Sequence, residues 1–150
     1  MKNKNNILLI TSIFLLIGCT NASLEKKIKN EIEECNSDKC KIVINQLTDF
    51  KWDKMLASNR YLSPEQIEAA IGVDYPYWKN NTRPMIFLYK NKIVYYENND
   101  DNVEHILNNQ VIFNQPDSIK YQIFTPSTAI FSAKRVEMSY GEHYFKLDKL

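Results

Sequence analysis

The sequence predicts a single α+β domain, in which an antiparallel sheet carries an N-terminal helix and one short helix packed on it. Three observations lead to this fold class. Apolar residues recur at every third or fourth position from Leu24 to Cys35, a second helical pattern begins at Ser63, and apolar segments in hairpin order fill much of residues 85–147. Because the helical segments come early and the strands follow one another, an antiparallel sheet is the natural arrangement.

Residues 1–19 have the pattern of an export signal. Lys2 and Lys4 precede an uncharged apolar run over 7–17, and a small residue, Gly18, follows it. A run of this length reaches about 16 Å as a helix, whereas the hydrocarbon core of a bilayer is about 30 Å thick. We therefore expect the run to be removed as a signal peptide and not to remain as a membrane span.

The end of this signal, Leu16-Ile17-Gly18-Cys19, resembles the lipobox of bacterial lipoproteins. The resemblance implies cleavage after Gly18, which makes 1–18 the signal peptide and 19–150 the mature domain. It also implies a diacylglyceryl group, and fatty acids such as palmitate, on Cys19. Two or three acyl chains on one residue hold a protein on a membrane for long periods. Cys19 is therefore expected to be a lipid attachment site and not a catalytic thiol; the alternative is a plain secretory signal with an incidental cysteine.

The expected location is the cell envelope, with the membrane as one partner through the lipid anchor. Thr20 follows the cysteine, where an aspartate would resemble the inner-membrane retention signal of some lipoproteins, so the outer membrane facing the periplasm is favoured. Loss of 1–18 removes two lysines and lowers the formal net charge from +1 to −1. A nearly neutral domain has no electrostatic attraction for nucleic acid, and we expect no nucleic-acid partner.

The first helix is predicted over 24–35, because Ser23 can cap its N-terminus and its apolar positions form one stripe. This stripe should lie on the body of the domain, and it consists of Leu24, Ile28, Ile32 and Cys35. The first turns of the helix also carry Lys26, Lys27 and Lys29, close to the expected lipid. These lysines are expected either to meet anionic headgroups or to form a solvated helix face.

Cys35 and Cys40 are an even pair in a compartment that permits disulfides. The residues between them, Asn36-Ser37-Asp38-Lys39, favour a turn that brings the two thiols together. A disulfide that closes so small a loop stabilises the fold by roughly 2 kcal/mol. We predict this disulfide; the alternatives are two free thiols or a metal site, for which no further ligand follows nearby.

A second, short helix has a clear start in the sequence. Ser63 is a capping residue, Pro64 stands at the first helical position, and Gln66 comes three residues after the cap. The helix should end at Gly72, because glycine is the usual residue just past a helix C-terminus.

The strongest β pattern is a hairpin of two strands, 85–89 and 93–96, which turns at Asn91. Apolar residues fall on both faces of both strands, as in central strands that are covered on two sides, and one cover is expected to be a helix. The acidic and amide-rich run 97–104 breaks the pattern.

The remaining elements are expected from shorter apolar stretches bounded by turn residues. Before the short helix, two strands over 41–47 and 50–56 should join near Thr48-Asp49. After the hairpin we expect one or two helical turns at 103–107, followed by strands at 121–124, 129–138 and 143–147, the last two turning through 139–141.

No recognisable catalytic set stands in the sequence. The chain has only three glycines, at positions 18, 72 and 141, so the serine-elbow pattern Gly-x-Ser-x-Gly cannot be formed. Ser23 and Lys26 match Ser-x-x-Lys, which a capping serine explains better. The histidines His105 and His143 lack a second metal ligand at helical spacing. The carboxylate pairs Asp49 with Asp53 and Asp100 with Asp101 have spacings that are common in soluble domains. We therefore expect no catalytic residue, no metal and no cofactor.

Aromatic residues offer a better candidate for binding. Tyr75, Tyr77 and Trp78 follow the predicted short helix around a proline, and three large rings are not easily buried together. Such residues are enriched where proteins bind partners, so we treat them as candidate partner-binding residues; core packing is the alternative. Tyr95 and Tyr96 are neighbours in a predicted strand and should point to opposite faces, so only one of them can line a given surface.

Three segments in sequence order resemble small bacterial lipoproteins of mostly unassigned role: Phe50-Lys51-Trp52-Asp53-Lys54, Tyr61-Leu62-Ser63-Pro64 and Ile71-Gly72. With the hydrophobic hairpin, the resemblance covers about residues 41–97. Some lipoproteins of this size and location are immunity proteins, which neutralise toxic effectors from competing cells; that step is an analogy of class and location. The lead hypothesis is a non-enzymatic binding lipoprotein, an immunity-type inhibitor of an effector such as a lipase. The alternatives are a housekeeping envelope lipoprotein that binds lipid or cell wall, and a hydrolase whose site is assembled only in the fold.

Overall fold

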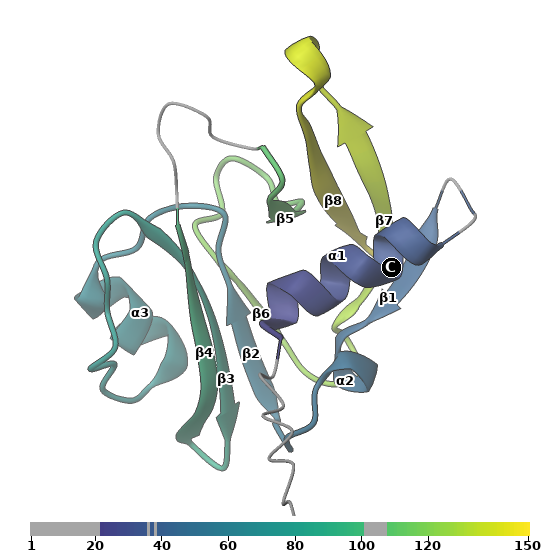
Figure 1. The fold of residues 1–150 in the computed structure, drawn as a ribbon. Coiled ribbons are helices and arrows are strands. Elements are labelled where there is room, and N and C mark those ends of the chain that lie inside the picture. Colours follow the sequence, from purple (N-terminus) through teal and green to yellow (C-terminus); the bar gives the residue numbers. More distant parts are fainter. Residues whose placement is uncertain (1–21, 36, 38, 101–107) are drawn as a thin grey trace, which may run out of the picture.

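The computed structural model describes residues 22–35, 37, 39–100 and 108–150, which fold as an α+β domain (Figure 1). The helical elements are α1 (Leu24–Glu34), α2 (Ile44–Leu47), α3 (Pro64–Ile71) and the 3-10 turn η1 (Ser139–Gly141). The strands are β1 (Cys40–Val43), β2 (Lys54–Ala57), β3 (Thr82–Tyr89), β4 (Lys92–Asp100), β5 (Val111–Phe113), β6 (Gln122–Phe124), β7 (Ile130–Glu137) and β8 (His143–Lys149). The predicted fold class is confirmed, although the strands form two sheets and not one.

Each sheet has four strands. Sheet A has the order β1-β7-β8-β5, and sheet B has the order β4-β3-β2-β6. All neighbouring strands are antiparallel except β5 and β8, which are parallel. Helix α1 packs against sheet A in the core that the two sheets share, whereas α3 lies on the opposite face of sheet B (Figure 1).

Sheet B is covered on both faces, as the hairpin pattern predicts. Alternate residues of β2 and β3 point to opposite sides of the sheet. Met55 and Phe87 lie in the core shared with α1 and sheet A, whereas Leu56 and Ile86 lie in a second core beneath α3. The continuous apolar run in β3 is therefore explained by two separate cores, and one cover is a helix as expected.

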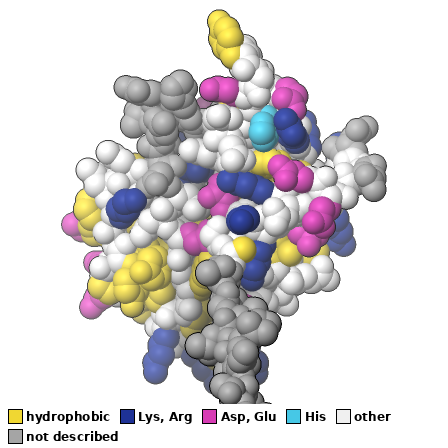
Figure 2. All heavy atoms as spheres, viewed as in Figure 1, with side chains coloured by type: hydrophobic (Ala, Val, Ile, Leu, Met, Phe, Trp, Pro, Cys, Tyr) yellow, Lys and Arg dark blue, Asp and Glu magenta, His cyan; other side chains and the backbone are white. Residues whose placement is uncertain are grey.

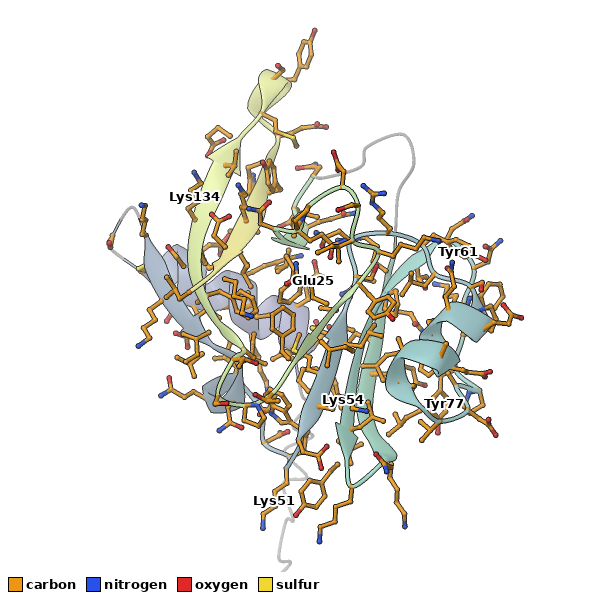
Figure 3. All side chains as sticks on the ribbon, turned by 180° about the vertical axis from the view of Figure 1, so that it is seen from behind. Glu25, Lys51, Lys54, Tyr61, Tyr77 and Lys134 are labelled. Atoms are coloured by element: carbon orange, nitrogen blue, oxygen red, sulfur yellow. A yellow bond between two sulfur atoms is a disulfide. The ribbon has the colours of Figure 1, made fainter. Side chains whose placement is uncertain are left out.

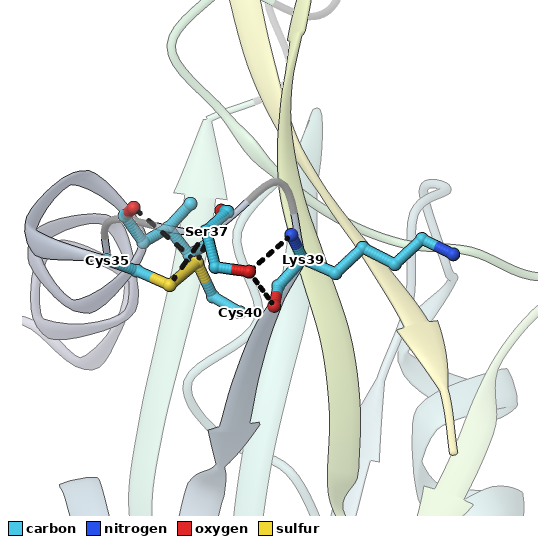
Figure 4. The surroundings of a disulfide bond; sticks show 5 residues. Cys35, Ser37, Lys39 and Cys40 are labelled. Carbon is cyan, nitrogen blue, oxygen red and sulfur yellow. Dashed lines mark hydrogen bonds between the residues drawn. A yellow bond between two sulfur atoms is a disulfide. The ribbon is translucent and has the colours of Figure 1, made fainter.

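Helix α1 begins and ends where its sequence indicates. Ser23 caps the N-terminus by accepting a hydrogen bond from the Lys26 amide at 3.2 Å. At the other end the predicted disulfide joins Cys35 to Cys40, with 6.0 Å between the Cα atoms, and so ties α1 to the start of β1 (Figure 4). Ser37 closes the loop between the cysteines, because its hydroxyl accepts from the Lys39 amide at 3.3 Å.

Helix α3 has the predicted capping box. The Ser63 hydroxyl accepts from the Gln66 amide, and the Gln66 side chain accepts from the Ser63 amide at 3.1 Å. The helix ends at Gly72, which has φ +82° and donates its amide to the Glu68 carbonyl at 2.8 Å. A left-handed residue at this position favours glycine, so the local sequence fixes both ends of the helix.

The β3–β4 hairpin turns through Lys90 and Asn91, both with positive φ, at 51° and 58°. Two successive residues in this conformation give the tight turn whose twist matches that of paired strands. The Lys90 amide donates to the Asp53 carboxylate at 2.7 Å, which fixes the turn to the segment ahead of β2. The hairpin is confirmed, but β4 continues through Asp100, so the polar run from residue 97 does not end the strand where the sequence pattern suggested.

The prediction of two joined strands over 41–47 and 50–56 is wrong in part. Only Cys40–Val43 and Lys54–Ala57 are strands, and they belong to different sheets. Between them α2 places Ile44 in the shared core, where it is fully buried, and the chain crosses from sheet A to sheet B. An apolar residue after a strand gives the same sequence pattern whether the chain continues as a strand or forms a helical turn, so α2 was missed.

The later strands follow the prediction closely. β6, β7 and β8 correspond to the strands expected at 121–124, 129–138 and 143–147, and η1 is the expected turn at 139–141. Strand β5 (Val111–Phe113) was not predicted. The helical turns expected at 103–107 lie outside the residues that the structure describes.

Candidate functional site

Of the three predicted partner-binding aromatics, Tyr75 lies in the core. Its side chain is only 2% exposed, and its hydroxyl donates to the Asn98 Oδ1 at 2.9 Å. Its backbone amide donates to the Glu68 carboxylate at 3.0 Å, which holds the loop after α3 against the helix. Burial raises the pKa of Tyr75 to about 12, because the ionised phenolate would lose its hydration. Tyr75 is thus the buried member of residues 75–78, which we call the aromatic loop.

Trp78 is half-buried beside Tyr61. Its indole N–H donates to the Leu62 carbonyl at 3.1 Å, and its ring meets that of Tyr61 edge to face, with 6.2 Å between centroids. The indole has a satisfied polar group and packs against the core beneath α3. Trp78 therefore fastens the loop, and Tyr61 is the more exposed ring of this pair, at 45%.

Tyr77 is the exposed member of the predicted trio. Its ring stacks on that of Tyr96 from β4, with centroids 4.2 Å apart and planes inclined by 11°, and the two side chains are 45% and 41% exposed. Both rings contact Tyr75 edge to face, at 5.9 and 6.1 Å. Figure 3 shows Tyr77 on the outer side of the molecule beside α3. An exposed stack therefore rests on a buried tyrosine.

Asn98 fixes this arrangement from β4. Its side-chain amide donates to the Tyr77 carbonyl at 2.7 Å, while its oxygen accepts from the Tyr75 hydroxyl. One side chain thus positions two residues of the aromatic loop against the strand. No sequence pattern selects Asn98, because its role depends on contacts with residues more than twenty positions away along the chain.

Strand β4 presents further apolar surface at the edge of sheet B. In the pairing of β3 with β4, Leu88 lies opposite Ile93 and Phe87 lies opposite Tyr95, so the register shifts by one residue and Val94 has no partner on β3. The Val94 side chain is 41% exposed. Within the described ranges, β3 is the only strand beside β4. We call Tyr77, Val94 and Tyr96 the aromatic edge; Figure 2 shows hydrophobic side chains gathered over β4.

A shallow hollow lies along the aromatic edge. Its volume is about 240 Å³, and it is lined by Tyr77, Ile93, Val94, Tyr95 and Tyr96. A hollow of this size accepts a side chain and not a drug-sized ligand, which needs roughly 300 Å³ or more. The geometry therefore suits contact with another polypeptide better than capture of a small molecule.

Tyr95 lies on the opposite face of β4 from Tyr96, as predicted from strand geometry. Its ring stacks on Phe50 at 4.8 Å, and its hydroxyl donates to Glu97 and accepts from the Leu24 amide at 3.2 Å. Burial raises the pKa of Tyr95, and the hydrogen bond to the Glu97 carboxylate raises it further, since both favour the neutral phenol.

The residues considered for catalysis are not assembled into a site in the described structure. The His143 ring packs edge to face on Phe145, with centroids 5.3 Å apart, and His105 lies outside the described residues. Asp53 accepts from the Lys90 amide, and Asp49 faces Lys27 at 3.9 Å. Among the residues that the structure describes, no three histidine, cysteine or acidic side chains are placed to share a metal ion.

The predicted signal peptide 1–18 and Cys19 lie outside the described residues, so both the cleavage and the lipid attachment stay predictions. Within the described ranges, no helix combines the length and the hydropathy needed to cross a membrane. Comparison of the chain with protein-family models, with curated proteins and with solved structures gave no match.

Proposed function

We propose that the chain is a lipid-anchored, non-enzymatic binding protein of the bacterial cell envelope, and that its partner adds an extended segment along β4. The anchor is proposed from the lipobox-like Leu16-Ile17-Gly18-Cys19. The binding role is proposed from the aromatic edge. One observation carries it: two stacked and exposed tyrosines stand beside a nine-residue strand whose outer side has no strand neighbour in the described structure.

An open strand edge supports recognition of an extended peptide. The outward backbone groups of β4 can pair with a strand of the partner, which supplies affinity largely independent of its sequence. The hollow beside Val94 and Tyr96 supplies selection, because it accepts one side chain of that strand. Tyr77 and Tyr96 add large apolar contact area with few rotatable bonds, as tyrosines do at binding hot spots.

The partner class that we propose is a toxic effector delivered by a competing cell, such as a lipase, which makes the protein an immunity-type inhibitor. The expected location at the periplasmic face of the outer membrane supports this class, because such effectors act there. The proposed effector class is supported only by the expected location and the size of the protein, since no residue of the chain specifies the effector.

The class is tested by deleting the gene and that of any neighbouring effector, and by challenging the deletion strain with sibling cells that secrete the effector. We expect the strain to lose resistance and to regain it when the full chain is supplied. Complete resistance without the gene, together with a defect in envelope integrity, would instead support the housekeeping alternative.

The binding surface is tested with the full chain carrying Tyr77→Ala and Tyr96→Ala. Loss of one hot-spot tyrosine typically costs at least about 2 kcal/mol, so we expect each single substitution to raise the Kd for the effector by about 30-fold and the double variant to raise it by up to about 1,000-fold. Tyr140→Ala is the matched control, because Tyr140 is fully exposed on η1. The turn between β7 and β8, which contains η1, lies far from β4 (Figure 1). Equal weakening by both variants would contradict the assignment of the surface.

The anchor is tested by growth with radiolabelled palmitate. We expect label in the wild-type protein and none in the Cys19→Ala variant, which should also keep its signal peptide and fail to mature. Unlabelled wild-type protein, or normal processing of the variant, would remove the anchor from the proposal and leave the aromatic edge to be judged by the binding test.

A further inference from the structure

We infer that the end of sheet B beside Ala22 is a docking surface for the headgroups of anionic phospholipids. The surface consists of three exposed lysines at the β3–β4 turn and just ahead of β2, which we call the lysine rim: Lys51, Lys90 and Lys92. This inference rests on the proposed lipid anchor. It extends that proposal from a flexible tether to a defined orientation of the domain on the bilayer.

The lysine rim lies at the end of the molecule where the described chain begins. Ala22 lines a small hollow together with Phe50 and Tyr95, and Lys51 follows Phe50 directly. Asp53 joins this segment to the hairpin turn: its amide donates to the Leu88 carbonyl at 2.8 Å, and its carboxylate accepts from the Lys90 amide at 2.7 Å. Figure 3 shows Lys51 at the same end as the β3–β4 turn.

The length of chain between Ala22 and Cys19 keeps this end close to the lipid. Three residues span at most about 10 Å when fully extended. That distance is close to the Debye length of about 8 Å at physiological salt, within which surface charges still interact. An acylated Cys19 therefore keeps Ala22, and with it the end of the domain that carries the lysine rim, close to the headgroups.

The charges of the lysine rim are free to act outward. In the described part of the chain, none of the three ammonium groups lies within ion-pair distance of a carboxylate, and Lys90 Nζ lies over the Tyr89 ring at 5.3 Å. Two carboxylates in the segment that carries Lys51 have other partners, since Asp49 faces Lys27 at 3.9 Å and Asp53 accepts from the Lys90 amide. A lysine next to a tyrosine also suits the headgroup region, where both residue types are common.

The lysines of α1, which the sequence offered for the same role, are less free. Lys29 pairs with Glu25 at 3.3 Å, and Lys27 donates to the Leu47 carbonyl at 3.3 Å besides facing Asp49. Folding thus directs two of these lysines to partners within the domain. The lysine rim, which is assembled from separate parts of the sequence, takes their place.

Docking through the lysine rim fixes the height of the aromatic edge. Tyr96 lies four residues along β4 from Lys92, which corresponds to about 13 Å at 3.3 Å per residue. With the lysine rim on the headgroups, the aromatic edge stands just above the bilayer surface. An effector that attacks the membrane would meet it there.

The test is lysine footprinting of the full lipidated protein in vesicles, with an amine-reactive reagent and mass spectrometry. Vesicles of phosphatidylethanolamine with phosphatidylglycerol are compared with vesicles of phosphatidylcholine alone. Each lysine near an anionic surface gains binding free energy that corresponds to about fivefold in affinity. We therefore expect the rim lysines to react with the amine reagent about fivefold more slowly on anionic vesicles than on phosphatidylcholine vesicles. High salt should restore their reactivity, because it screens the attraction. The control lysines on sheet A and the disulfide loop should not change: Lys39, Lys41 and Lys134.

A charge-matched pair of variants gives a second measurement. Hydrogen exchange of the β3–β4 turn amides should slow on anionic vesicles in the wild type and in K39E/K41E/K134E. It should not slow in K51E/K90E/K92E, which has the same net charge as that control. Figure 3 places Lys134 far from Lys51, and all six positions are exposed, so folding should survive in both variants.

Each outcome separates the two proposals. If palmitate labels the protein and the rim lysines react equally on both kinds of vesicle, the lysine rim is refuted and the anchor stands. If they are protected only when a protein effector is bound, the lysine rim is a protein interface and the inference is overturned. If no palmitate is incorporated, the anchor and the inference fall together.

Discussion

The two faces of β4 differ in burial: the inner face packs in a core, whereas the outer face carries the proposed binding surface. On the inner face the Tyr95 ring stacks on Phe50 and packs against Phe87, and its hydroxyl is fixed by Glu97. On the outer face the Tyr96 ring stacks on Tyr77, and more than 40% of each side chain remains exposed. Neighbouring residues of the same type thus have opposite roles, because the pleat turns one toward a core and the other toward solvent.

The comparison teaches that aromatic content alone does not identify a binding surface. The inner cluster buries its rings around Phe87, which has no exposed surface. The outer cluster buries only Tyr75 and leaves the two stacked rings above it in contact with water. Substitutions in the inner cluster should therefore affect stability, and substitutions in the outer cluster should affect binding.

The largest effect is expected from Phe87→Ala. Phe87 meets Phe50 and Trp52 edge to face at 5.4 and 5.1 Å, so its removal leaves a cavity that these rings cannot fill. We expect the free energy of unfolding to fall by about 3 to 5 kcal/mol, measured by urea denaturation. A loss below about 1 kcal/mol would show that the inner cluster can rearrange, and the contrast between the faces would weaken.

The next effect is expected at alkaline pH. The pKa of Tyr75 is raised to about 12 and that of Tyr95 is raised as well, whereas an unfolded tyrosine titrates near 10. The unfolded chain therefore loses these protons first, so stability is unchanged below about pH 10 and falls as the pH rises toward 12. Urea denaturation between pH 8 and 11.5 measures the fall, and Tyr75→Phe with Tyr95→Phe should make the decline shallower. An unchanged decline would contradict the assigned burial.

A smaller effect is expected from Glu97→Gln. The Glu97 carboxylate accepts from the Leu24 amide and from the Glu25 amide, the latter at 3.2 Å, and thereby places a negative charge at the N-terminus of α1. Replacing it with a neutral amide should lower the free energy of unfolding by about 1 to 2 kcal/mol, measured by thermal and urea denaturation. Glu33→Gln, in the last turn of α1, is the control and should be neutral or slightly stabilising.

The smallest effect on stability is expected from Tyr96→Ala. The stacked pair contributes about 0.5 to 1.5 kcal/mol beyond its buried area, and much of it is exposed, so we expect a loss of no more than about 1 kcal/mol. The same substitution should give the larger loss of partner binding described above. A large loss of stability measured by urea denaturation would mean that the aromatic edge belongs to the core.

Elements fixed by local sequence were predicted well. The capping box of α3, the turn at Asn91 and the disulfide between Cys35 and Cys40 each depend on residues a few positions apart, and all three are confirmed. The division into two sheets, the parallel pairing of β5 with β8 and the helical turn α2 were not predicted. The first two depend on which distant segments pair, and no local pattern records that choice. The turn α2 was missed because an apolar residue after a strand fits a helical turn and a strand equally well.

The candidate site was predicted only in outline. Composition selected Tyr75, Tyr77 and Trp78, but it could not show that the fold buries the first and leaves the second exposed. Alternation in the strand indicated that one of Tyr95 and Tyr96 would face outward. The exposure of Val94 follows from a register shift against β3, and such a shift leaves no mark in a single sequence.

The hydrogen bonds of α1 have a mechanical consequence. A force applied to the chain ahead of Ala22 reaches the domain at the first turn of α1. There the amides of Leu24 and Glu25 donate to the carboxylate of Glu97, which belongs to β4 of sheet B. One turn of helix contains a second link, because the Glu25 carboxylate accepts from the Val111 amide of sheet A at 3.0 Å. A force on the N-terminal segment is therefore shared by both sheets. We expect it not to separate the strands of one sheet in sequence.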